Sequence, residues 1–371
     1  MSFRKRGVVL PQSGSTNPSA SSPTPPTAAK ELPKGTRPSP LTGNPTTSTG
    51  TPSLDSLLGG HSGLVLGSLL LLEEHGTTDF GGAVLRYYGA EGVVQGHTVH
   101  VLGVGEGWGR ELPGLNEEKP KKGVAKVDGI GREREERMKI AWRYERLGEF
   151  GASGREKNPS TSTFCHDFDL SKRLVLPSPS NMHFIPLSTQ MDLQFRDADT
   201  TASPFTKCLS QLQTHLLSSN PATIHRIIIP NLLSPALYPS HASQPEHILQ
   251  FLHALRALLR KHPSTTSALI TLPLSLYPRS TGLTRWIELL SDGVLELAPF
   301  PSSSLQVKST PGQEEPAQGM LNVHRLPGWG EGSASGDDLS FLLSRRKGLV
   351  IRPYSLPPVE GDNEAQQGGL E

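Results

Sequence analysis

An apolar strand followed directly by a helical pattern constrains this chain more than any other feature. The run SLLLL at residues 68–72 predicts a buried strand, and a turn with one glycine follows it. The stretch HTVHVLGV at residues 97–104 predicts the next strand. Between the two strands, apolar residues recur at the spacing of an amphipathic helix, at Phe80, Ala83, Val84, Tyr87 and Tyr88. This strand–helix–strand order is typical of a parallel sheet covered by helices on both faces.

The alternation continues through the second half of the chain. Helical patterns occupy residues 205–216, 246–262 and 283–290, and strands are predicted at 181–187, 224–230 and 267–274. The last strands, at residues 294–300, 319–327 and 347–357, have no helices between them. We therefore expect an α/β fold with a parallel core, flanked by helices, and antiparallel strands at its C-terminal edge.

Composition divides the chain into one domain and two tails. Residues 1–46 are rich in Pro, Ser and Thr, with nine prolines among the first fifty residues, so they bury too little surface to offset the entropy of ordering. Residues 47–358 are expected to form a single domain with a flexible polar insertion at about 105–165. Residues 359–371 form a polar C-terminal tail.

The charge and cysteine content exclude several classes of protein. The net charge of +1 over 371 residues creates no global field that attracts nucleic acid or membrane. Cys165 and Cys208 are too few for a disulfide framework. No run of the sequence approaches the ~18 apolar residues of a membrane-spanning helix. We expect a soluble intracellular protein that does not contact membranes.

The turn after the first strand lies where a phosphate-binding loop would be, yet it lacks the Gly-Lys-Thr of such a loop. A triphosphate needs amide donors and positive charge, and two carboxylates at this point repel it. We favour a turn that caps the following helix, and a degenerate nucleotide site shared with a neighbouring subunit remains the alternative. The residues at this position are Glu73, Glu74, His75, Gly76, Thr77 and Thr78.

A second expected charge is missing from the strand at residues 224–230. An ATPase of this architecture ends that strand with an Asp that holds Mg²⁺, whereas Pro230 and Asn231 follow the isoleucines here. Asn is neutral and a weaker ligand for Mg²⁺ than a carboxylate. The loss of both charges together favours loss of ATP hydrolysis at this degenerate Walker B position.

Motifs along the chain carry a resemblance to a known family. The stretch TSTGTPSLDSLLGGHSGLVLGSLLLLEE resembles the start of RecA-like domains of the KaiC type. SFRKRG, MKIAWRYE, FCHDFDLSKRL, IIIPNLLSP, LPLSLYPR, NVHRLP and IRPYSLPP occur in an order that resembles the PAXNEB family, the fourth subunit of the Elongator complex. The resemblance covers most of residues 2–6 and 46–358, and the combination of motifs is specific.

The resemblance implies a RecA-like fold and a place in a larger assembly. Members of this family form a heterohexameric ring with Elongator subunits five and six, in two copies each. The ring binds tRNA and docks on the catalytic subcomplex of Elongator, which adds a carboxymethyl-type group to wobble uridine in cytoplasm and nucleus. The resemblance attributes ATP hydrolysis to the ring, whereas the two missing charges favour a non-catalytic subunit that binds no cofactor of its own, with ATP possible at the ring interfaces. The alternative is an ATPase subunit that hydrolyses ATP at a ring interface through the degenerate loop.

Basic residues outside the apolar pattern are candidate RNA contacts. Phosphate contacts need such groups, although solvated loop charges explain them equally well. The candidates are Lys119, Lys121, Lys122, Arg143, Arg345 and Arg346.

The motif FCHDFDL offers a thiol, an imidazole and two carboxylates. One Cys with one His falls short of a zinc-binding set, so we expect no metal here. Packing by Phe164 and Phe168, with the polar groups exposed, is the favoured interpretation. A hydrolase that uses Cys165 and His166 is a third functional hypothesis.

Overall fold

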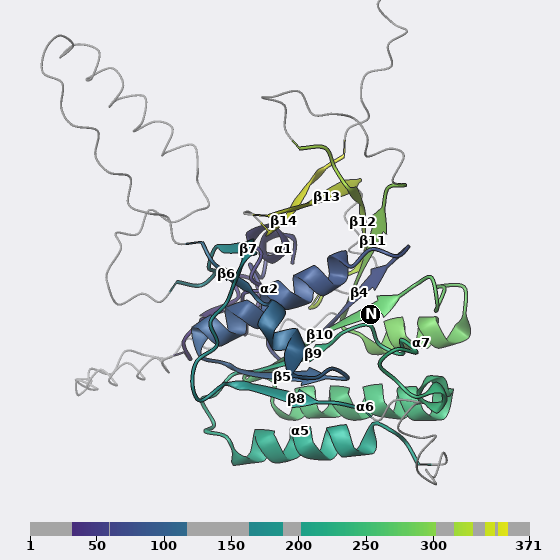
Figure 1. The fold of residues 1–371 in the computed structure, drawn as a ribbon. Helices are drawn as coiled ribbons and strands as arrows, with labels where there is room; N and C mark the ends of the chain where they lie inside the picture. Colours follow the sequence, from purple (N-terminus) through teal and green to yellow (C-terminus); the bar gives the residue numbers. More distant parts are fainter. Residues whose placement is uncertain are drawn as a thin grey trace, which may run out of the picture. The chain divides into compact units, whose positions relative to one another are not determined.

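The computed structural model describes residues 32–58, 60–116, 163–187, 202–301, 315–328, 338–345 and 348–354. These residues form a nine-stranded sheet with the order β14-β13-β12-β11-β4-β10-β9-β5-β8 (Figure 1). The strands of its parallel core are β4 (Leu69–Glu74), β5 (Thr98–Leu102), β8 (Met182–Ile185), β9 (His225–Ile229), β10 (Thr266–Pro273) and β11 (Gly293–Pro299). The antiparallel strands are β12 (Gly319–Arg325), β13 (Leu339–Ser344) and β14 (Gly348–Pro353).

The helices and two small sheets complete the described part. The helices are α1 (Pro52–Leu57), α2 (Phe80–Gln95), α5 (Thr206–Ser218), α6 (Pro245–Lys261) and α7 (Gly282–Leu290), with 3₁₀ turns at Glu106–Glu111 and Ser240–Ser243. β1 (Thr36–Pro38), β2 (Pro45–Thr47) and β3 (Leu64–Val65) form one small sheet. β6 (Pro113–Leu115) and β7 (Phe168–Arg173) form the other. None of the described helices is long and apolar enough to cross a membrane.

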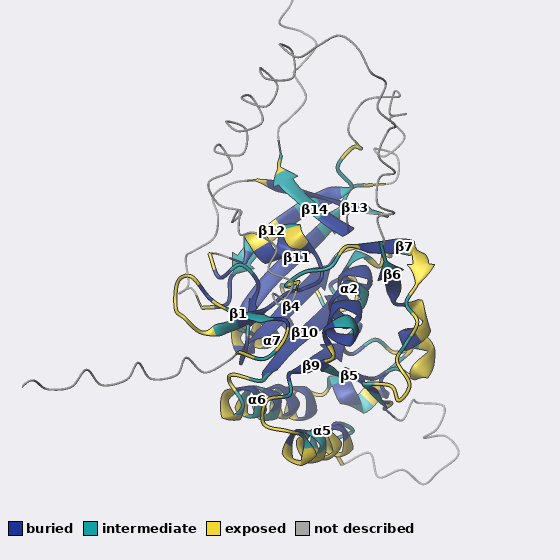
Figure 2. Cartoon of the chain, turned by 90° about the vertical axis from the view of Figure 1, so that its left-hand side faces the viewer, coloured by how far each residue is buried: buried dark blue, intermediate teal, exposed yellow. Residues whose placement is uncertain are grey.

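The leucine run of β4 feeds two hydrophobic cores, one on each face of the sheet. Side chains alternate along a strand, so Leu69 and Leu71 join the core beneath α5, α6 and α7. Leu70 and Leu72 join the core beneath α2. All four leucines are at most 2% exposed, and Figure 2 shows the central strands in the colour of buried residues. This two-sided burial explains why the run is continuously apolar.

The expected fold class is confirmed, with one correction within the sheet. We expected residues 294–300 to pair only with antiparallel strands, but β11 lies parallel to β4 and antiparallel to β12. The helix α7 carries the chain from β10 across β4, and such a crossover makes the next strand parallel. The antiparallel part of the sheet therefore begins at β12.

Helix α2 differs from an amphipathic surface helix. Tyr87 and Tyr88 are fully buried, and most residues from Gly81 to Gln95 are buried on every side. One surface of α2 packs on strands of the large sheet, β14 included, and another contacts β6 of a small sheet. Its apolar stripe therefore marks only one of the two surfaces that it buries.

The folded domain begins before residue 47. Residues 32–46, which the sequence places in the N-terminal tail, contain β1 and the start of β2. The Ser39 hydroxyl bonds His61 Nδ1 at 2.6 Å, and the Lys34 carbonyl oxygen lies 2.8 Å from His97 Nε2. Polar bonds of this kind leave no apolar periodicity in the sequence. Residues 1–31, most of the predicted insertion at 105–165, and the tail at 359–371 lie outside the described residues.

Candidate functional site at the carboxyl edge of the sheet

Glu73 and Glu74 end β4 and belong to the strand, which corrects the expectation that they lie in a turn. Glu73 is 0% exposed and Glu74 is 8% exposed. Their positions in β4 place them at the carboxyl edge of the parallel strands, where ligands bind in open α/β sheets. Glu74 accepts hydrogen bonds there, whereas Glu73 has an ion-pair partner, Arg279.

Glu74 caps helix α2 from outside the helix. Its Oε1 accepts hydrogen bonds from the backbone N–H of Phe80 at 2.9 Å and from the Thr78 hydroxyl at 2.7 Å. Its Oε2 accepts from the backbone N–H of Gly81 at 2.8 Å. The N-cap residue Asp79 makes no side-chain cap bond. The expected helix-capping turn is present, but the cap comes from Glu74.

This cap occupies the amide groups that a phosphate would need. Free N–H groups at a helix N-terminus attract anions, and the carboxylate of Glu74 satisfies two of them within the chain. A Cβ placed on Gly81 would lie 3.1 Å from Glu74 Oε2, so glycine permits this close approach. The chain itself supplies the anion at this helix end.

Glu74→Ala should lower the free energy of unfolding by about 1–2 kcal/mol, because it removes a helix cap and leaves buried amides unpaired. Urea denaturation of the full chain measures this change. Asp79→Ala is the matched control, since Asp79 forms only a half-exposed ion pair with Arg86 and should contribute less than about 1 kcal/mol. Equal stability of the two variants would contradict the capping role.

The rest of the turn is fixed by contacts with neighbouring strands. The His75 N–H donates to the Leu297 carbonyl oxygen at 3.0 Å, and His75 Nε2 lies 2.7 Å from Glu296 Oε1. Gly76 has a left-handed φ of 81°, and its carbonyl oxygen accepts from the Ser275 hydroxyl. Thr77 and Thr78 are exposed, and the Thr78 hydroxyl is engaged by Glu74.

Asn231 follows β9 in a left-handed turn with φ of 44°. Its backbone N–H donates to Thr271 Oγ1 at 2.7 Å, and the Leu232 N–H donates to the Thr271 carbonyl oxygen. Asn tolerates the left-handed region better than most residues. At the position where an ATPase would have the Walker B Asp, Asn231 thus forms a backbone turn that is hydrogen-bonded to β10.

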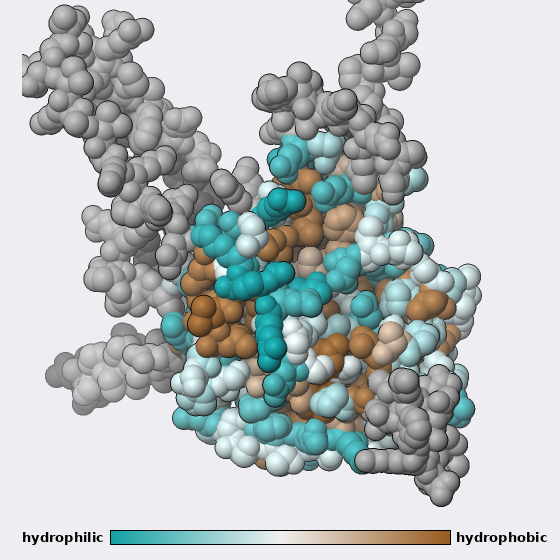
Figure 3. Space-filling model, viewed as in Figure 1, coloured by the Kyte–Doolittle hydropathy of each residue, from teal (hydrophilic) through white to brown (hydrophobic). Residues whose placement is uncertain are grey.

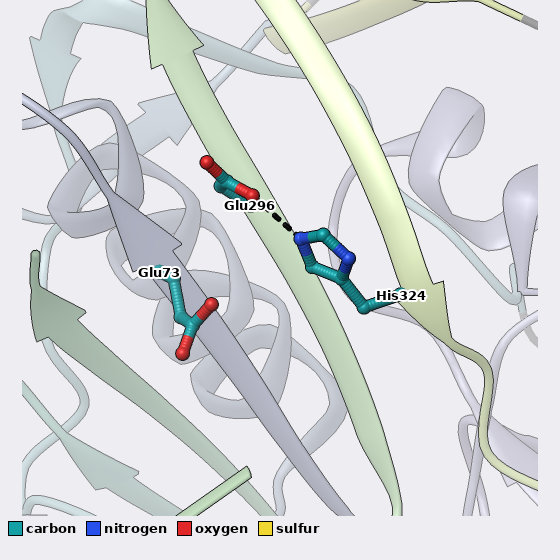
Figure 4. Close-up of side chains that lie close together, drawn as sticks. All are labelled: Glu73, Glu296 and His324. Atoms are coloured by element: carbon teal, nitrogen blue, oxygen red, sulfur yellow. Dashed lines mark hydrogen bonds and ion pairs between the residues drawn. The ribbon is translucent and has the colours of Figure 1, made fainter. Parts of the chain in front are cut away.

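A charged cluster that the sequence analysis missed lies beside Glu73. Glu73 pairs in register with Glu296 of β11, and His324 of β12 contacts Glu296 with Nε2 2.5 Å from Oε2 (Figure 4). Arg279, after β10, places Nε 3.2 Å from Glu73 Oε2 and 2.7 Å from Glu288 Oε1. These groups are distant in sequence, and only the register of β4 against β11 would have indicated the cluster.

Glu73 and Glu296 of this cluster have opposite pKa shifts. Burial, together with the charge of Glu288, raises the pKa of Glu73 to about 8. The hydrogen bond from His324 holds the pKa of Glu296 at about 2. Glu296 is therefore the ionised member, and Glu73 holds a proton near neutral pH.

Most of the candidate RNA contacts lie outside the described residues. Lys119, Lys121, Lys122, Arg143 and Arg346 belong to this group. Arg345 directly follows β13 and is exposed, and its carbonyl oxygen accepts a bond from the Leu170 N–H. An RNA role for these residues remains a prediction.

Of the polar residues in FCHDFDL only Asp167 is exposed, which corrects the expectation that the polar groups of this motif are exposed. The His166 backbone N–H and Nδ1 contact the fully buried Glu91 carboxylate at 2.9 and 3.0 Å. Asp169 is 6% exposed. Burial and the charge of Asp55 raise the pKa of the Cys165 thiol, and a nucleophilic Cys needs a lowered pKa. The geometry therefore disfavours a Cys165–His166 hydrolase.

Arg226, near the start of β9, is the centre of a second polar network. The sequence analysis did not identify this residue. Its side chain in β9 is fully buried. The guanidinium donates to His97 Nδ1 at 3.0 Å, the Ser48 carbonyl oxygen at 2.8 Å, the Tyr88 carbonyl oxygen at 3.0 Å and Thr47 Oγ1 at 2.6 Å. It thereby joins the segment before α1 to α2 and to the sheet. A single Arg within an apolar strand gives no signal of such a network.

Comparisons with known proteins agree with the motifs. The family profile described as "PAXNEB protein" matches residues 28–370. The Elongator complex protein 4 of Schizosaccharomyces pombe is 31% identical over 331 residues, which cover 84% of this chain and 85% of that protein. The human Elongator complex protein 4 is 32% identical over 348 residues, which cover 86% of this chain and 78% of the human protein.

A solved structure with a similar chain path is that of a KaiC-like protein from Pyrococcus horikoshii. It is 14% identical, has a TM-score of 0.39, and the match covers 83% of this chain and 99% of that chain. The family profile spans most of the sequence, and the relatives match over most of their length, so the family is shown without this likeness. On those two findings, the chain belongs to the PAXNEB family.

Proposed function

We propose that this chain is the fourth subunit of an Elongator complex and acts without catalysing a reaction itself. The observation that carries the second part is the Glu74 carboxylate on the first amides of α2, where a nucleotide phosphate would bind. The first part rests on relatives named Elongator complex protein 4 that match over most of their length. The subunit supports carboxymethyl-type modification of wobble uridine, in cytoplasm and nucleus.

The proposed assembly is a ring with Elongator subunits five and six, two copies of each, that binds tRNA and docks on the catalytic subcomplex. Exposed apolar side chains on α7 support an assembly role. Trp286 is 55% exposed and Leu289 is 48% exposed, and their spacing of three residues puts them on one face of the helix. Apolar patches interrupt the polar surface shown in Figure 3, and aromatic residues are enriched in protein interfaces.

Co-expression with the two RecA-like partners, followed by native mass measurement, tests the assembly. We expect a 2:2:2 complex that retains this chain. Double substitution of Trp286 and Leu289 by Ser should weaken the complex, whereas the exposed pair Lys207 and Lys261, changed to Ser, should not. A chain that remains a monomer in the presence of both partners would refute the proposal.

The alternative function is hydrolysis of ATP at a ring interface through the degenerate loop. Thr77 and Thr78 are the only hydroxyl groups of that loop, and one of them is bonded to Glu74. Replacing both by Ala in the purified ring should leave ATP hydrolysis unchanged. Loss of turnover in that double variant would instead favour the ATPase.

The candidate basic loop gives a separate test of tRNA binding. Changing Lys119, Lys121 and Lys122 to Ala in the assembled ring should weaken tRNA binding and reduce the slope of log K against log salt by about 2–3, if each lysine contacts one phosphate. Fluorescence anisotropy at several salt concentrations measures both quantities. The double variant of Lys207 and Lys261 again serves as the control, and an unchanged slope would exclude these phosphate contacts.

A further inference from the structure

Three side chains from neighbouring strands place metal-binding atoms together at the carboxyl edge. Glu73 of β4, Glu296 of β11 and His324 of β12 each offer one ligand atom, and these atoms lie within 4.8 Å of one another. Figure 4 shows the three side chains on adjacent strands, with His324 directed at Glu296. Ligands on rigid strands are held more firmly than ligands on loops.

The carboxylate of Glu73 lacks hydrogen-bond donors although it is fully buried. Neither of its oxygens has a hydrogen-bond partner among the described residues. The nearby Arg279 Nε, 3.2 Å from Oε2, carries a single hydrogen, which it donates to Glu288 Oε1 at 2.7 Å. Arg279 therefore supplies charge to Glu73 but no hydrogen bond. A buried acceptor without a donor is unfavourable, so a bound cation would relieve this deficit.

The surrounding charges leave room for a cation. Three carboxylates, Glu73, Glu288 and Glu296, face the guanidinium groups of Arg279 and Arg285. Near neutral pH Glu73 holds a proton, which a bound cation would displace, and three negative charges would then meet two positive charges. Arg285 is 61% exposed at its side chain, so its charge is well solvated and opposes a bound ion weakly. The additional negative charge would lie on Glu73 itself, which is fully buried.

The donor set selects the class of metal. One imidazole nitrogen and two carboxylate oxygens suit Zn²⁺ and similar transition metals, whereas Mg²⁺ and Ca²⁺ prefer oxygen ligands alone. His75 Nε2, 2.7 Å from Glu296 Oε1, is placed to orient that ligand from outside. We propose that Glu73, Glu296 and His324 form a binding site for one divalent transition-metal ion, with Zn²⁺ as the representative ion.

Isothermal titration of chelator-stripped full-length protein with ZnCl₂ tests the proposal. We expect one ion bound per chain at this site, and Co²⁺ should give ligand-field absorption in the visible range. His324→Gln and Glu296→Gln should each weaken zinc binding by roughly 10-fold or more. Loss of a residue that only hydrogen-bonds a metal ligand already lowers metal affinity by about 10-fold, and these two residues are proposed as ligands themselves. Glu73→Gln preserves the side-chain shape and serves as a third variant if another fails to fold.

A second group of imidazoles requires a matched control. His183 and His215 are partly exposed with ring centroids 4.3 Å apart, so they offer zinc another place to bind. His215→Gln and the exposed His253→Gln should retain the affinity of the unmodified protein. Equal affinity in the unmodified and His324→Gln proteins, loss of binding in His215→Gln instead, or no uptake of zinc would each overturn the proposal.

Discussion

Replacing Arg226 with Met should lower the free energy of unfolding by about 3–5 kcal/mol, the largest effect expected of any single change in this domain. The guanidinium donates four hydrogen bonds, and its Cζ lies 4.5 Å from the centre of the Tyr88 ring. Met fills much of the same volume, so the loss comes from polar groups left without partners. The Ser48 carbonyl oxygen and His97 Nδ1 lose this donor, and the Thr47 hydroxyl keeps only its bond to the Gly35 carbonyl oxygen.

The charge of Arg226 matters beyond its hydrogen bonds. Asp55 and Glu91 are buried nearby, and both favour the charged guanidinium. Without it, each carboxylate loses a compensating charge in a medium of low polarity. We therefore expect the segment before α1 and the loop that contains His166 to detach together, because Asp55 and Glu91 hold them to the domain.

Urea denaturation of the full chain measures the Arg226 effect. Arg260→Met is the control, because Arg260 is 60% exposed and its ion pair with Asp292 should contribute less than about 1 kcal/mol. Protection of amide hydrogens in residues 47–55 should fall in Arg226→Met before the sheet opens. A loss of stability no greater than that of Arg260→Met would show that the network is dispensable.

Acidification from pH 6.5 to 4 should destabilise the domain by about 2–3 kcal/mol through His225 alone. Burial and the neighbouring His262 lower the pKa of His225 to about 4, from an ordinary value of 6.5. Between pH 6.5 and 4 the unfolded chain therefore binds a proton at His225 that the folded chain does not bind. The contribution of neutral His225 to the free energy of unfolding is fully present above pH 6.5 and is lost as the pH falls towards 4.

The geometry around His225 explains the shift. His225 Nδ1 lies 3.0 Å from His100 Nε2, and their rings stack with centroids 5.3 Å apart. His183 and His215 pack on the far side of His100. Burial and these neighbours also lower the pKa of His100. A proton on one ring would repel a proton on its neighbours. Because His215 lies on α5 and the other three rings lie on sheet strands, we expect acid to weaken the contact between α5 and the sheet.

Denaturation curves across this pH range check the prediction. His225→Gln should flatten the dependence of the unfolding free energy on pH, while His253→Gln, on the exposed face of α6, should leave it unchanged. Parallel curves for His225→Gln and the unmodified protein would assign the acid sensitivity to other groups. His97 is one such group, because burial and Arg226 lower its pKa to about 3.

The sequence predicts elements well where burial alone decides them. The leucines of β4 and the stripe of α6, with Ile248, Phe251, Leu252 and Leu255 fully or almost fully buried, follow the periodicity of strand and helix. The parallel direction of β11 could also be predicted, because a helix precedes that strand in the sequence. Grouping β11 with the later strands, which have no helices between them, overlooks this signal.

The polar part of the candidate site could not be predicted in the same way. Glu73 and Glu74 look like turn residues, since carboxylates are rare in strands that are buried on both faces. Their partners decide otherwise: Glu74 bonds the amides of the next helix, and Glu73 meets Arg279 and Glu296, more than two hundred residues away. Contacts at that separation leave no periodic trace, so charged networks emerge only once strand register is known.

The carboxylate of Glu74 has a consequence for how the subunit responds to the cell. A helix end that is closed by a covalently attached anion is saturated at every concentration of free nucleotide. We expect this chain to keep one conformation whether adenine nucleotides are scarce or abundant. In an assembly that senses energy supply, the sensing would then fall to the other chains, and this one would provide a constant frame.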